Sequence, residues 1–358
     1  STTPRNESAR TSRPDDAAAA AGAHPRASTH SLDPMRIVVV GAGAVGGVVA
    51  ANLTMAGTPV VAVARGEHGR VMRESGLRYE SPRGTTSVEV PVVATIGEIE
   101  FTDDDVVMLG VKSQDTVEVL NDLRAAGVTG QPIVCMQNGV ENERLALRLF
   151  PNVYGMVVML PADHHAPGVV RVWTAPSSGL LDLGRYPHGV DDLCVDLAAT
   201  LRSATFGSIP RDDIMAWKYR KLLMNLGNAI EAVCGRSGFG GRLYDMVQAE
   251  GEAVLSAAGI TVTSVEDDQA RRGDALTIQP VGDDHRRAGG STWQSLQRGT
   301  GAIETDYLTG EIVLLGRLHG VATPANEALQ RLAAEMARAG EPPASRSVDD
   351  VLRAIDGS

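Results

Sequence analysis

A glycine-rich turn near the start of the ordered sequence has the residues needed to bind a diphosphate. Residues 36–40 form a β-branched apolar run led by an arginine, and the pattern GxGxxG follows immediately. Glycines at this spacing let the backbone approach a pyrophosphate, whose charge then lies on free N–H groups at a helix start. The order strand, turn, helix predicts a dinucleotide site, although a tight turn without ligand is the alternative. The predicted cofactor-binding residues of this turn are Gly41, Ala42, Gly43, Ala44, Val45 and Gly46.

Arg65 indicates which nicotinamide dinucleotide is bound. It follows a second predicted strand, 59–64, and lies roughly 20 residues beyond the last glycine. An acidic residue here would accept a hydrogen bond from the ribose 2′-hydroxyl of NAD, whereas an arginine can pair with the 2′-phosphate of NADP. Arg65 therefore favours NADP(H). The nearby Glu67 keeps NAD as an alternative cofactor. Arg65 could also be a solvated residue at the end of a strand, with no role in binding.

Lysine is rare in this chain, which makes each lysine a candidate for chemistry. Only Lys112, Lys218 and Lys221 are lysines among 33 Lys and Arg residues. An ammonium group can lose its proton or act as a compact acid, whereas a guanidinium group cannot. Lys112 directly follows a predicted buried strand, 105–111, at the carboxyl end where open α/β sheets bind ligands. Asn138 has the same position after the strand 132–136, with a turn-forming role as its alternative.

A helix predicted over 212–234, capped by Asp212 or Asp213 and ended by Gly235, carries a polar stripe. At 100° per residue, Asn225 lies about 40° from Lys221 and Asn228 about 20° on the other side. Apolar residues cover most of the remaining surface, so the stripe is either part of a substrate pocket or a solvent-facing strip. Gly227, in the middle of the helix, indicates close approach by another group.

The composition excludes several classes of protein. The formal net charge is −11 with no basic block, so we expect neither nucleic acid nor an anionic membrane surface as partner. No window holds 18 uninterrupted apolar residues, so none should span a bilayer. The three cysteines are widely spaced without CxxC, and His164 and His165 would point to opposite faces of a strand; we expect no disulfide framework, no metal site and a reducing, cytoplasmic location.

The pattern along the chain predicts an α/β fold. Residues 1–34 are polar, lack apolar periodicity and should form a disordered tail. Residues 35–210 alternate strands and helices, as in a Rossmann-type dinucleotide-binding domain, and residues 211–358 read as an all-helical substrate and catalytic domain. Within the second part, Thr323 is predicted to cap a helix that begins at Pro324 and runs to about residue 339.

From residue 35 to about residue 339 the chain resembles the ketopantoate reductase (2-dehydropantoate 2-reductase) family. The marks occur in order across both predicted domains. They are GxGxxG at 41–46, Arg65, Val111-Lys112, Gln137-Asn138-Gly139, Pro167-Gly168, Lys221 with Asn225, Ser291 before Trp293-Gln294, Glu304-Thr-Asp306-Tyr-Leu-Thr-Gly310, and Thr323-Pro324-x-Asn326.

The resemblance implies an NADPH-dependent oxidoreductase of pantothenate biosynthesis. Lys221 would be the general acid and Glu304 would hold the substrate hydroxyl. Asn138 and Ser291 would bind the carboxylate of the 2-oxo acid, with Asn225 and Asn228 beside them. Arg65, Lys112 and Asn138 would bind the cofactor.

Two positions depart from the family pattern, so the identity of the substrate is not decided by the resemblance. Ala229 stands where a second asparagine is usual, with Asn228 one place earlier, and Ser295 stands where an aspartate is usual. We expect ketopantoate as the default substrate, with another ketone of a specialised pathway as an alternative. A non-catalytic NADP-binding sensor is the hypothesis from a different class. The partners expected are a small 2-oxo acid and, as an option, a second copy of the chain in a homodimer.

Overall fold

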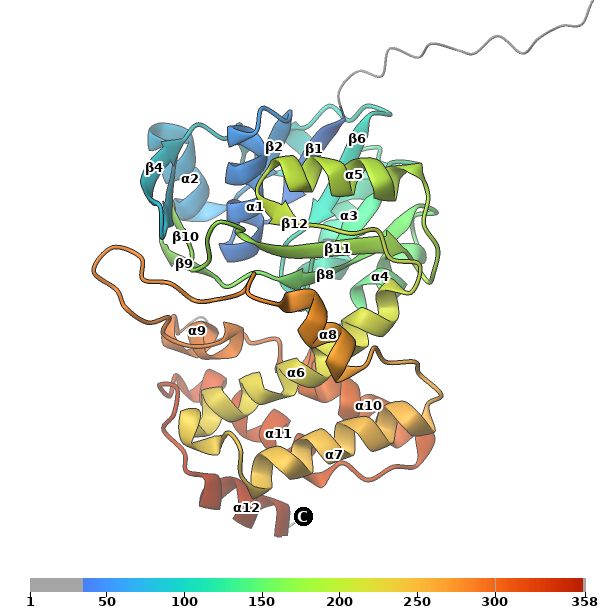
Figure 1. Ribbon diagram of the computed structural model, residues 1–358, viewed down its shortest axis with the longest axis vertical. Coiled ribbons are helices and arrows are strands. Elements are labelled where there is room, and N and C mark those ends of the chain that lie inside the picture. Colours follow the sequence, from blue (N-terminus) through green and yellow to red (C-terminus); the bar gives the residue numbers. More distant parts are fainter. Residues whose placement is uncertain (1–34, 300, 357–358) are drawn as a thin grey trace, which may run out of the picture. The chain divides into compact units, whose positions relative to one another are not determined.

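The computed structural model describes residues 35–299 and 301–356, so the predicted disordered tail, 1–34, lies outside the described residues. An eight-stranded sheet organises the first part of the described chain, in the order β12-β11-β8-β7-β6-β1-β2-β5 (Figure 1). Six of these strands, β1, β2, β5, β6, β7 and β8, run parallel to one another. Strand β11 pairs antiparallel with β8. These strands are β1 (Arg36–Val40), β2 (Val60–Val63), β5 (Val92–Val93), β6 (Asp105–Leu109), β7 (Ile133–Cys135), β8 (Val153–Met159), β11 (Gly179–Arg185) and β12 (Phe206–Gly207).

Helices connect the strands and form the two apolar layers that bury the sheet. Alternate residues of β1 point to opposite faces: Ile37 and Val39 belong to one apolar cluster, and Val38 and Val40 to another. A central parallel strand is therefore apolar throughout, as its sequence predicted. The helices are α1 (Ala44–Met55), α2 (Gly66–Ser75), α3 (Thr116–Ala125), α4 (Asn142–Leu147) and α5 (Asp192–Ser203).

A smaller four-stranded sheet, in the order β4-β3-β10-β9, packs beside α1. Its hairpin of β3 (Leu77–Ser81) and β4 (Gly84–Val88) turns between Ser81 and Gly84. The strands β9 (Ala162–Ala166) and β10 (Val169–Val172) are joined at Pro167-Gly168, where Gly168 has a φ of +74°. Positive φ is accessible to glycine at little cost, which is why this turn forms here.

The second part of the chain is helical, as predicted. Residue 210 lies between the last strand of the sheet and the first of these helices; a domain boundary there stays a prediction. In the described residues of this part no helix has both the length and the apolar composition to cross a bilayer. The helices are α6 (Ile214–Cys234), α7 (Arg242–Ala257), α8 (Val265–Arg272), α9 (Ser291–Gln297), α10 (Thr309–His319), α11 (Pro324–Ala339) and α12 (Val348–Asp356).

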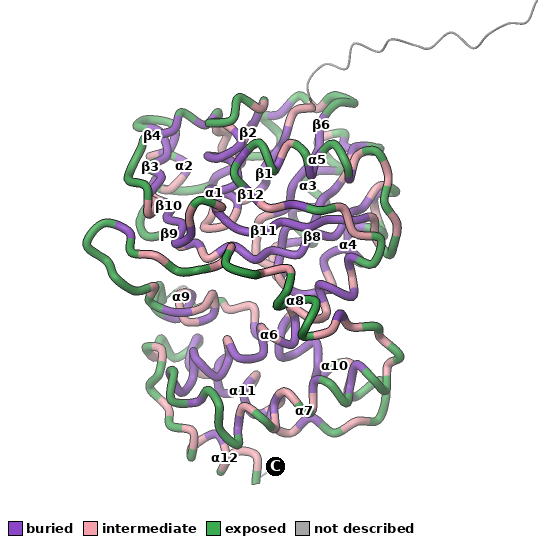
Figure 2. The backbone as a smooth tube through the Cα atoms, in the orientation of Figure 1, coloured by how far each residue is buried: buried purple, intermediate pink, exposed green. Residues whose placement is uncertain are grey.

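Helix α6 is the element on which both parts pack. It contacts β8 of the sheet as well as α7, α9 and α11, and it is buried along most of its length (Figure 2). Gly235, with a φ of +73°, ends it as predicted. The expected close approach at Gly227 is also present, since an added Cβ would lie 2.9 Å from Cε1 of Phe239.

Two predicted helix caps are wrong in their chemistry. Asp213 and Thr323 do precede α6 and α11, but neither side chain makes a capping hydrogen bond. Their ψ angles of 35° and 48° lie outside the extended region from which a side chain reaches the N–H groups of the first turn. The carboxylate of Glu250, on α7, instead accepts from the backbone N–H groups of Ala325 (2.8 Å) and Asn326 (2.9 Å).

A buried ion pair joins α6 to the α/β part. Lys218 Nζ donates to Glu143 Oε1 of α4 and to the carbonyl oxygen of Gln137 (3.1 Å). The two charged side chains are 2% and 0% exposed. Burial raises the pKa of Glu143, and the charge of Lys218 opposes that shift. Because a charge without a partner is costly in such surroundings, this contact fixes where α6 meets the sheet.

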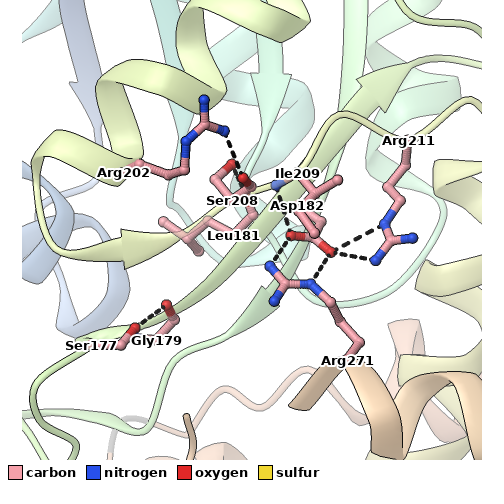
Figure 3. Close-up of polar contacts among 9 residues, drawn as sticks. All are labelled: Ser177, Gly179, Leu181, Asp182, Arg202, Ser208, Ile209, Arg211 and Arg271. Carbon is pink, nitrogen blue, oxygen red and sulfur yellow. Dashed lines mark hydrogen bonds and ion pairs between the residues drawn. The ribbon is translucent and has the colours of Figure 1, made fainter. Parts of the chain in front are cut away.

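A second charged cluster links β11 to the helical part (Figure 3). Asp182, 1% exposed, accepts from Arg271 of α8 at 2.6 and 2.8 Å and from Arg211, before α6, at 3.1 and 3.2 Å. It also accepts from the backbone N–H of Ile209 at 3.0 Å. Five donors on one carboxylate satisfy a buried charge fully.

The buried pair makes a stability prediction. Glu143→Ala should lower the free energy of unfolding by about 3–5 kcal/mol, because it leaves the buried ammonium of Lys218 with the carbonyl oxygen of Gln137 but without a counter-charge. Urea unfolding followed by circular dichroism measures the loss. Replacing both residues by Leu and Met of similar volume should recover most of it.

Glu74→Ala is the matched control. Glu74 also pairs with a cation, Arg70, but both side chains are at least half exposed, at 57% and 50%. Its removal should leave the unfolding midpoint nearly unchanged, because exposed pairs are screened by solvent. Equal effects of the two substitutions would contradict a structural role for the Lys218–Glu143 pair.

Candidate functional site

The glycine turn has the shape that a diphosphate needs. Gly41 has a φ of +97°, and an added Cβ there would lie 2.7 Å from Cγ1 of Val111. A Cβ on Gly46 would lie only 2.1 Å from the carbonyl oxygen of Gly41, so these two glycines are required by packing. Above Gly43, in contrast, nothing lies within 4 Å of the Cβ position. The turn is therefore tight on its inner side and open on the side from which a ligand approaches α1.

Two cavities meet at this turn. The larger, of ≈480 Å³, lies between the carboxyl ends of the strands and α6; the second, of ≈450 Å³, lies over β2 and α2. Gly43, Val111 and His164 line both. A dinucleotide consists of two halves joined by a diphosphate. Two cavities that meet at a glycine turn therefore suit such a ligand.

The larger cavity brings together most of the predicted site residues, from segments far apart in sequence. Gly41, Ala42 and Arg65 instead line the second cavity, whereas Gly46 packs beneath the turn. The predicted residues that line the larger cavity are Gly43, Ala44, Val45, Lys112, Asn138, Lys221, Asn225, Asn228, Ser291 and Glu304.

The amides of the predicted stripe connect α6 to the sheet. Asn225 Nδ2 donates to Asn138 Oδ1 at 3.2 Å, and Asn228 Nδ2 donates to Asn225 Oδ1 at 3.4 Å. The stripe thus faces the cavity, as one of the two alternatives predicted. These contacts orient the amide groups and leave other donors and acceptors for a ligand.

Lys221 presents an ammonium group to the cavity. Among the described residues it has no hydrogen-bond or ion-pair partner, in contrast to Lys218 one turn earlier. The pKa of Lys221 is lowered to about 8, mainly by burial and also by the charges of Arg287 and Arg272, whereas Asp268 opposes the shift. An ammonium with a pKa near neutrality is suited to proton donation in a shielded site.

Ser295 of α9 and Glu304 beyond it also line the larger cavity. Glu304 Oε1 accepts from the backbone N–H of Ser113 at 3.0 Å and from its hydroxyl at 3.2 Å. Burial raises the pKa of Glu304, opposed by the Ser113 N–H. Lys112 Nζ donates to Ser295 Oγ (3.0 Å) and to the Ala302 carbonyl oxygen (3.1 Å). Polar contacts thus connect the end of β6 to the chain around α9.

Arg65 lies exposed at the rim of the second cavity, as the residue that precedes α2. Glu67, the residue that kept NAD as an alternative, forms an ion pair with Arg70 at 2.6 Å on the surface of α2. Glu67 does not line the cavity. Among the described residues that line this cavity, Arg65 is the one arginine or lysine, and the carboxylates of Glu118 and Asp122 also line it.

Several residues that line the two cavities were not predicted from the sequence. His68 bridges Ala42 O (2.7 Å) and the N–H of Gly168 (2.9 Å), so its ring is neutral with the proton on Nε2. It packs against His164 with ring centroids 4.2 Å apart. Arg272, Arg287 and Arg298 also line the larger cavity. In a chain so rich in arginine, no sequence signal distinguishes these three.

Comparison with known proteins identifies relatives along nearly the whole described chain. The family model described as Ketopantoate reductase PanE/ApbA matches residues 37–187, and the model of its C-terminal part matches residues 213–337. A 2-dehydropantoate 2-reductase of Mesorhizobium japonicum is 30% identical over 336 residues, which cover 85% of this chain and 98% of the relative. The enzyme of the same name from Pyrococcus abyssi is 27% identical over 301 residues, covering 82% and 94%.

Solved structures share the fold. A ketopantoate reductase of the PanE/ApbA family from Ralstonia eutropha superposes with a TM-score of 0.72 at 28% identity, covering 86% of this chain and 100% of that one. D-mandelate dehydrogenase in complex with NADH and anilino(oxo)acetate also gives a TM-score of 0.72, with the same coverage, at 22% identity. At that identity the similarity concerns the fold alone.

The open space above Gly43 makes a binding prediction. Gly43→Ala should fold normally, because its φ of −70° suits alanine and nothing lies within 4 Å of the new methyl group. If a diphosphate lies over the turn, the methyl group should weaken dinucleotide binding about tenfold or more, the effect of a ~1.4 kcal/mol clash. Thermal melting and fluorescence titration with NADPH measure the two properties. Gly130→Ala, an exposed glycine with equal space, is the control; unchanged NADPH affinity in both variants would contradict the diphosphate position.

Proposed function

Since the chain belongs to the ketopantoate reductase family, we propose that it reduces a 2-oxo acid to a 2-hydroxy acid with NADPH. Like its relatives named 2-dehydropantoate 2-reductase, it is an oxidoreductase that acts on a CH–OH group. The default substrate is ketopantoate, reduced to pantoate. The observation that carries the proposal is the ammonium of Lys221, which faces the cavity that begins at the glycine turn and has no partner among the described residues. A homodimer stays a prediction.

The residues present fit a nicotinamide dinucleotide. The turn 41–46 leaves room above Gly43 for a diphosphate, and the two cavities extend from it in the two directions that a dinucleotide requires. Arg65 would bind the 2′-phosphate of NADPH at the rim of the second cavity. Lys112 and Asn138 line the larger cavity beside the turn and would contact the cofactor there. When bound, NADPH supplies the hydride.

The side chains then divide the remaining tasks. Hydride addition to a ketone builds negative charge on the carbonyl oxygen, which a nearby ammonium stabilises and then protonates. Lys221 would do both, because burial brings its pKa to about 8 and it has no competing partner among the described residues. Asn138 and Ser291 would bind the substrate carboxylate. Glu304, already oriented by Ser113, would hold the substrate hydroxyl.

The residues at the two positions that depart from the family pattern support the family's hydride-transfer reaction but leave the identity of the substrate undecided. Asn228 reaches the cavity although it lies one position before the usual asparagine, and Ser295 accepts a hydrogen bond from Lys112 where the family usually has an aspartate. A related 2-oxo acid or another ketone is therefore the alternative to ketopantoate. A non-catalytic sensor would need neither Lys221 nor Glu304 in the cavity. NADPH oxidation with a panel of 2-oxo acids, ketopantoate included, tests the proposal, and tight NADPH binding without turnover on any of them would favour the sensor.

Lys221→Ala should lower kcat roughly 10²- to 10⁴-fold, the range typical for removal of a general acid. NADPH affinity should be nearly unchanged, because the proposed role is in proton donation. Lys221→Arg keeps the positive charge but holds its proton too tightly to donate it, so it should remain slow. Steady-state rates and NADPH titrations separate these effects.

The pH profile provides a second measurement on the same residue. The active form of a general acid is protonated, so kcat/KM for reduction should fall as pH rises through about 8. Full turnover by Lys221→Ala, or a flat profile across that range, would remove Lys221 from the mechanism.

Arg65→Ala should weaken NADPH binding about 10- to 100-fold, as expected for a lost charge-assisted contact with a phosphate. NADH has no 2′-phosphate, so its affinity should change little. Dissociation constants for both cofactors measure the difference. Arg70→Ala is the control, because Arg70 lies on the same surface but pairs with Glu67 and Glu74. Equal losses for NADPH and NADH in Arg65→Ala would contradict the phosphate contact.

A further inference from the structure

The larger cavity is strongly cationic for its size. Among the described residues that line it there is a single carboxylate, that of Glu304, which accepts hydrogen bonds from Ser113. An excess of cationic over anionic side chains in a partly desolvated cavity favours an anionic ligand, because the charge of the ligand neutralises the cations. The cationic lining residues are Lys112, Lys221, Arg272, Arg287 and Arg298.

The five cations have different neighbours. Lys112 Nζ and Arg298 NH2 both contact Ser295 Oγ, at 3.0 and 3.5 Å, and the charge of Arg298 lowers the pKa of Lys112 behind a larger effect of burial. Arg287 and Arg272 affect the pKa of Lys221 instead, which places their guanidinium groups within electrostatic reach of that ammonium. Of the five, Arg287 and Arg272 are therefore near the group proposed to protonate the substrate.

Arg272 is held in position by the anchoring of α8. Its neighbour Arg271 forms the two-pronged contact with Asp182 of β11, which fixes the end of α8 against the sheet (Figure 3). Arg272 itself donates through Nε to Asp268 at 2.8 Å, with NH2 at 2.7 Å. Consecutive arginines therefore divide two tasks: Arg271 binds the α/β part and Arg272 faces the cavity.

Arg287 is positioned by a separate set of contacts. Its Nε donates to Asp163 Oδ1 and its NH2 to the carbonyl oxygen of Ala162, both at 3.1 Å. The segment between α8 and α9 that carries it is also tied down by Gln279, whose N–H donates to Trp173 O at 2.8 Å, and by Asp284, which pairs with Arg171 at 2.6 Å. The guanidinium group is thus fixed before any ligand binds.

Both guanidinium groups keep donors free for a ligand. Among the described residues, neither NH1 atom has a hydrogen-bond partner. The tethering carboxylates of Asp163 and Asp268 do not line the cavity, so the cavity wall presents the arginines and not the aspartates. Fixed guanidinium donors are the groups that bind carboxylates most strongly and with defined geometry.

We propose that Arg272 and Arg287 bind the carboxylate of the 2-oxo acid as its charged partners, beside the neutral donors Asn138 and Ser291. The inference rests on the proposed function and adds the two residues that make the site specific for an acid over a neutral ketone. Met224 and Leu276 line the same cavity and supply apolar contacts for the remainder of the substrate. The carboxylate is held next to Lys221, so the adjacent carbonyl oxygen lies on the side of the proton donor.

The test compares a 2-oxo acid with its methyl ester, which has the same ketone without the charge. Arg287→Ala and Arg272→Ala should each raise KM for the acid about 10-fold or more, the effect of a lost charged hydrogen bond. KM for the ester and the affinity for NADPH should stay nearly unchanged. Arg287→Lys keeps the charge without the planar fork and should recover part of the loss. Arg286→Ala, an exposed neighbour that does not line the cavity, is the control.

Two further readouts separate binding from a merely structural role. In Arg287→Ala the alkaline fall of kcat/KM should move to higher pH, because the charge that lowers the pKa of Lys221 is gone. Calorimetric titration of the NADPH complex with oxamate, an unreactive 2-oxo acid mimic, should show weaker binding in both arginine variants. Equal losses for acid and ester, or unchanged oxamate binding, would overturn the assignment even if the wild-type protein reduces 2-oxo acids. Absence of turnover by the wild type would instead reject the proposed function, while oxamate binding still tests the arginines.

Discussion

The buried pair of Lys218 and Glu143 is the contact on which the geometry of the site depends. It joins a helix of the second part of the chain to a helix of the first, with both side chains almost without exposure. Neither charge can move away from its partner without being left desolvated and alone. The pair therefore fixes both the rotation of α6 about its axis and its position along the sheet. Lys221 follows three residues later, on an adjacent azimuth, so its direction into the cavity is set by the same contact.

A second set of contacts connects the segments, distant in sequence, that together line the cavity. The end of β6 is bonded to the chain around α9 through Lys112 with Ser295 and through Ser113 with Glu304. The amide contact between Asn138 and Asn225 links β7 to α6. Donors and acceptors from both parts are therefore already oriented in the absence of ligand, which lowers the cost of binding. The proposed acid, Lys221, differs from these residues because it has no partner of its own among the described residues.

Charge in the cavity is arranged in the same way, with anchors outside the lining and free donors inside it. Asp268 holds Arg272 and Asp163 holds Arg287, while Asp182 anchors α8 through Arg271, which does not line the cavity. Each carboxylate offsets the cost of a partly buried guanidinium group and removes its freedom to rotate. The arginine side chains therefore stay in the cavity wall and do not turn outward to solvent. An anionic ligand then meets donors that are already in place.

The sequence by itself determined the features that depend on local geometry. The buried strand before the glycine turn, the turn itself, the end of α6 at Gly235 and the shared face of Lys221, Asn225 and Asn228 all follow from periodicity or from backbone restrictions. Only the tertiary structure decided which lysine anchors and which faces the cavity, since Lys218 finds its partner 75 positions away. It likewise replaced the expected Thr323 cap by Glu250, and it brought Arg272, Arg287 and Arg298, among many arginines, to the wall of the larger cavity. Electrostatic partners are chosen by proximity in space, and neither residue type nor spacing along the chain records that proximity.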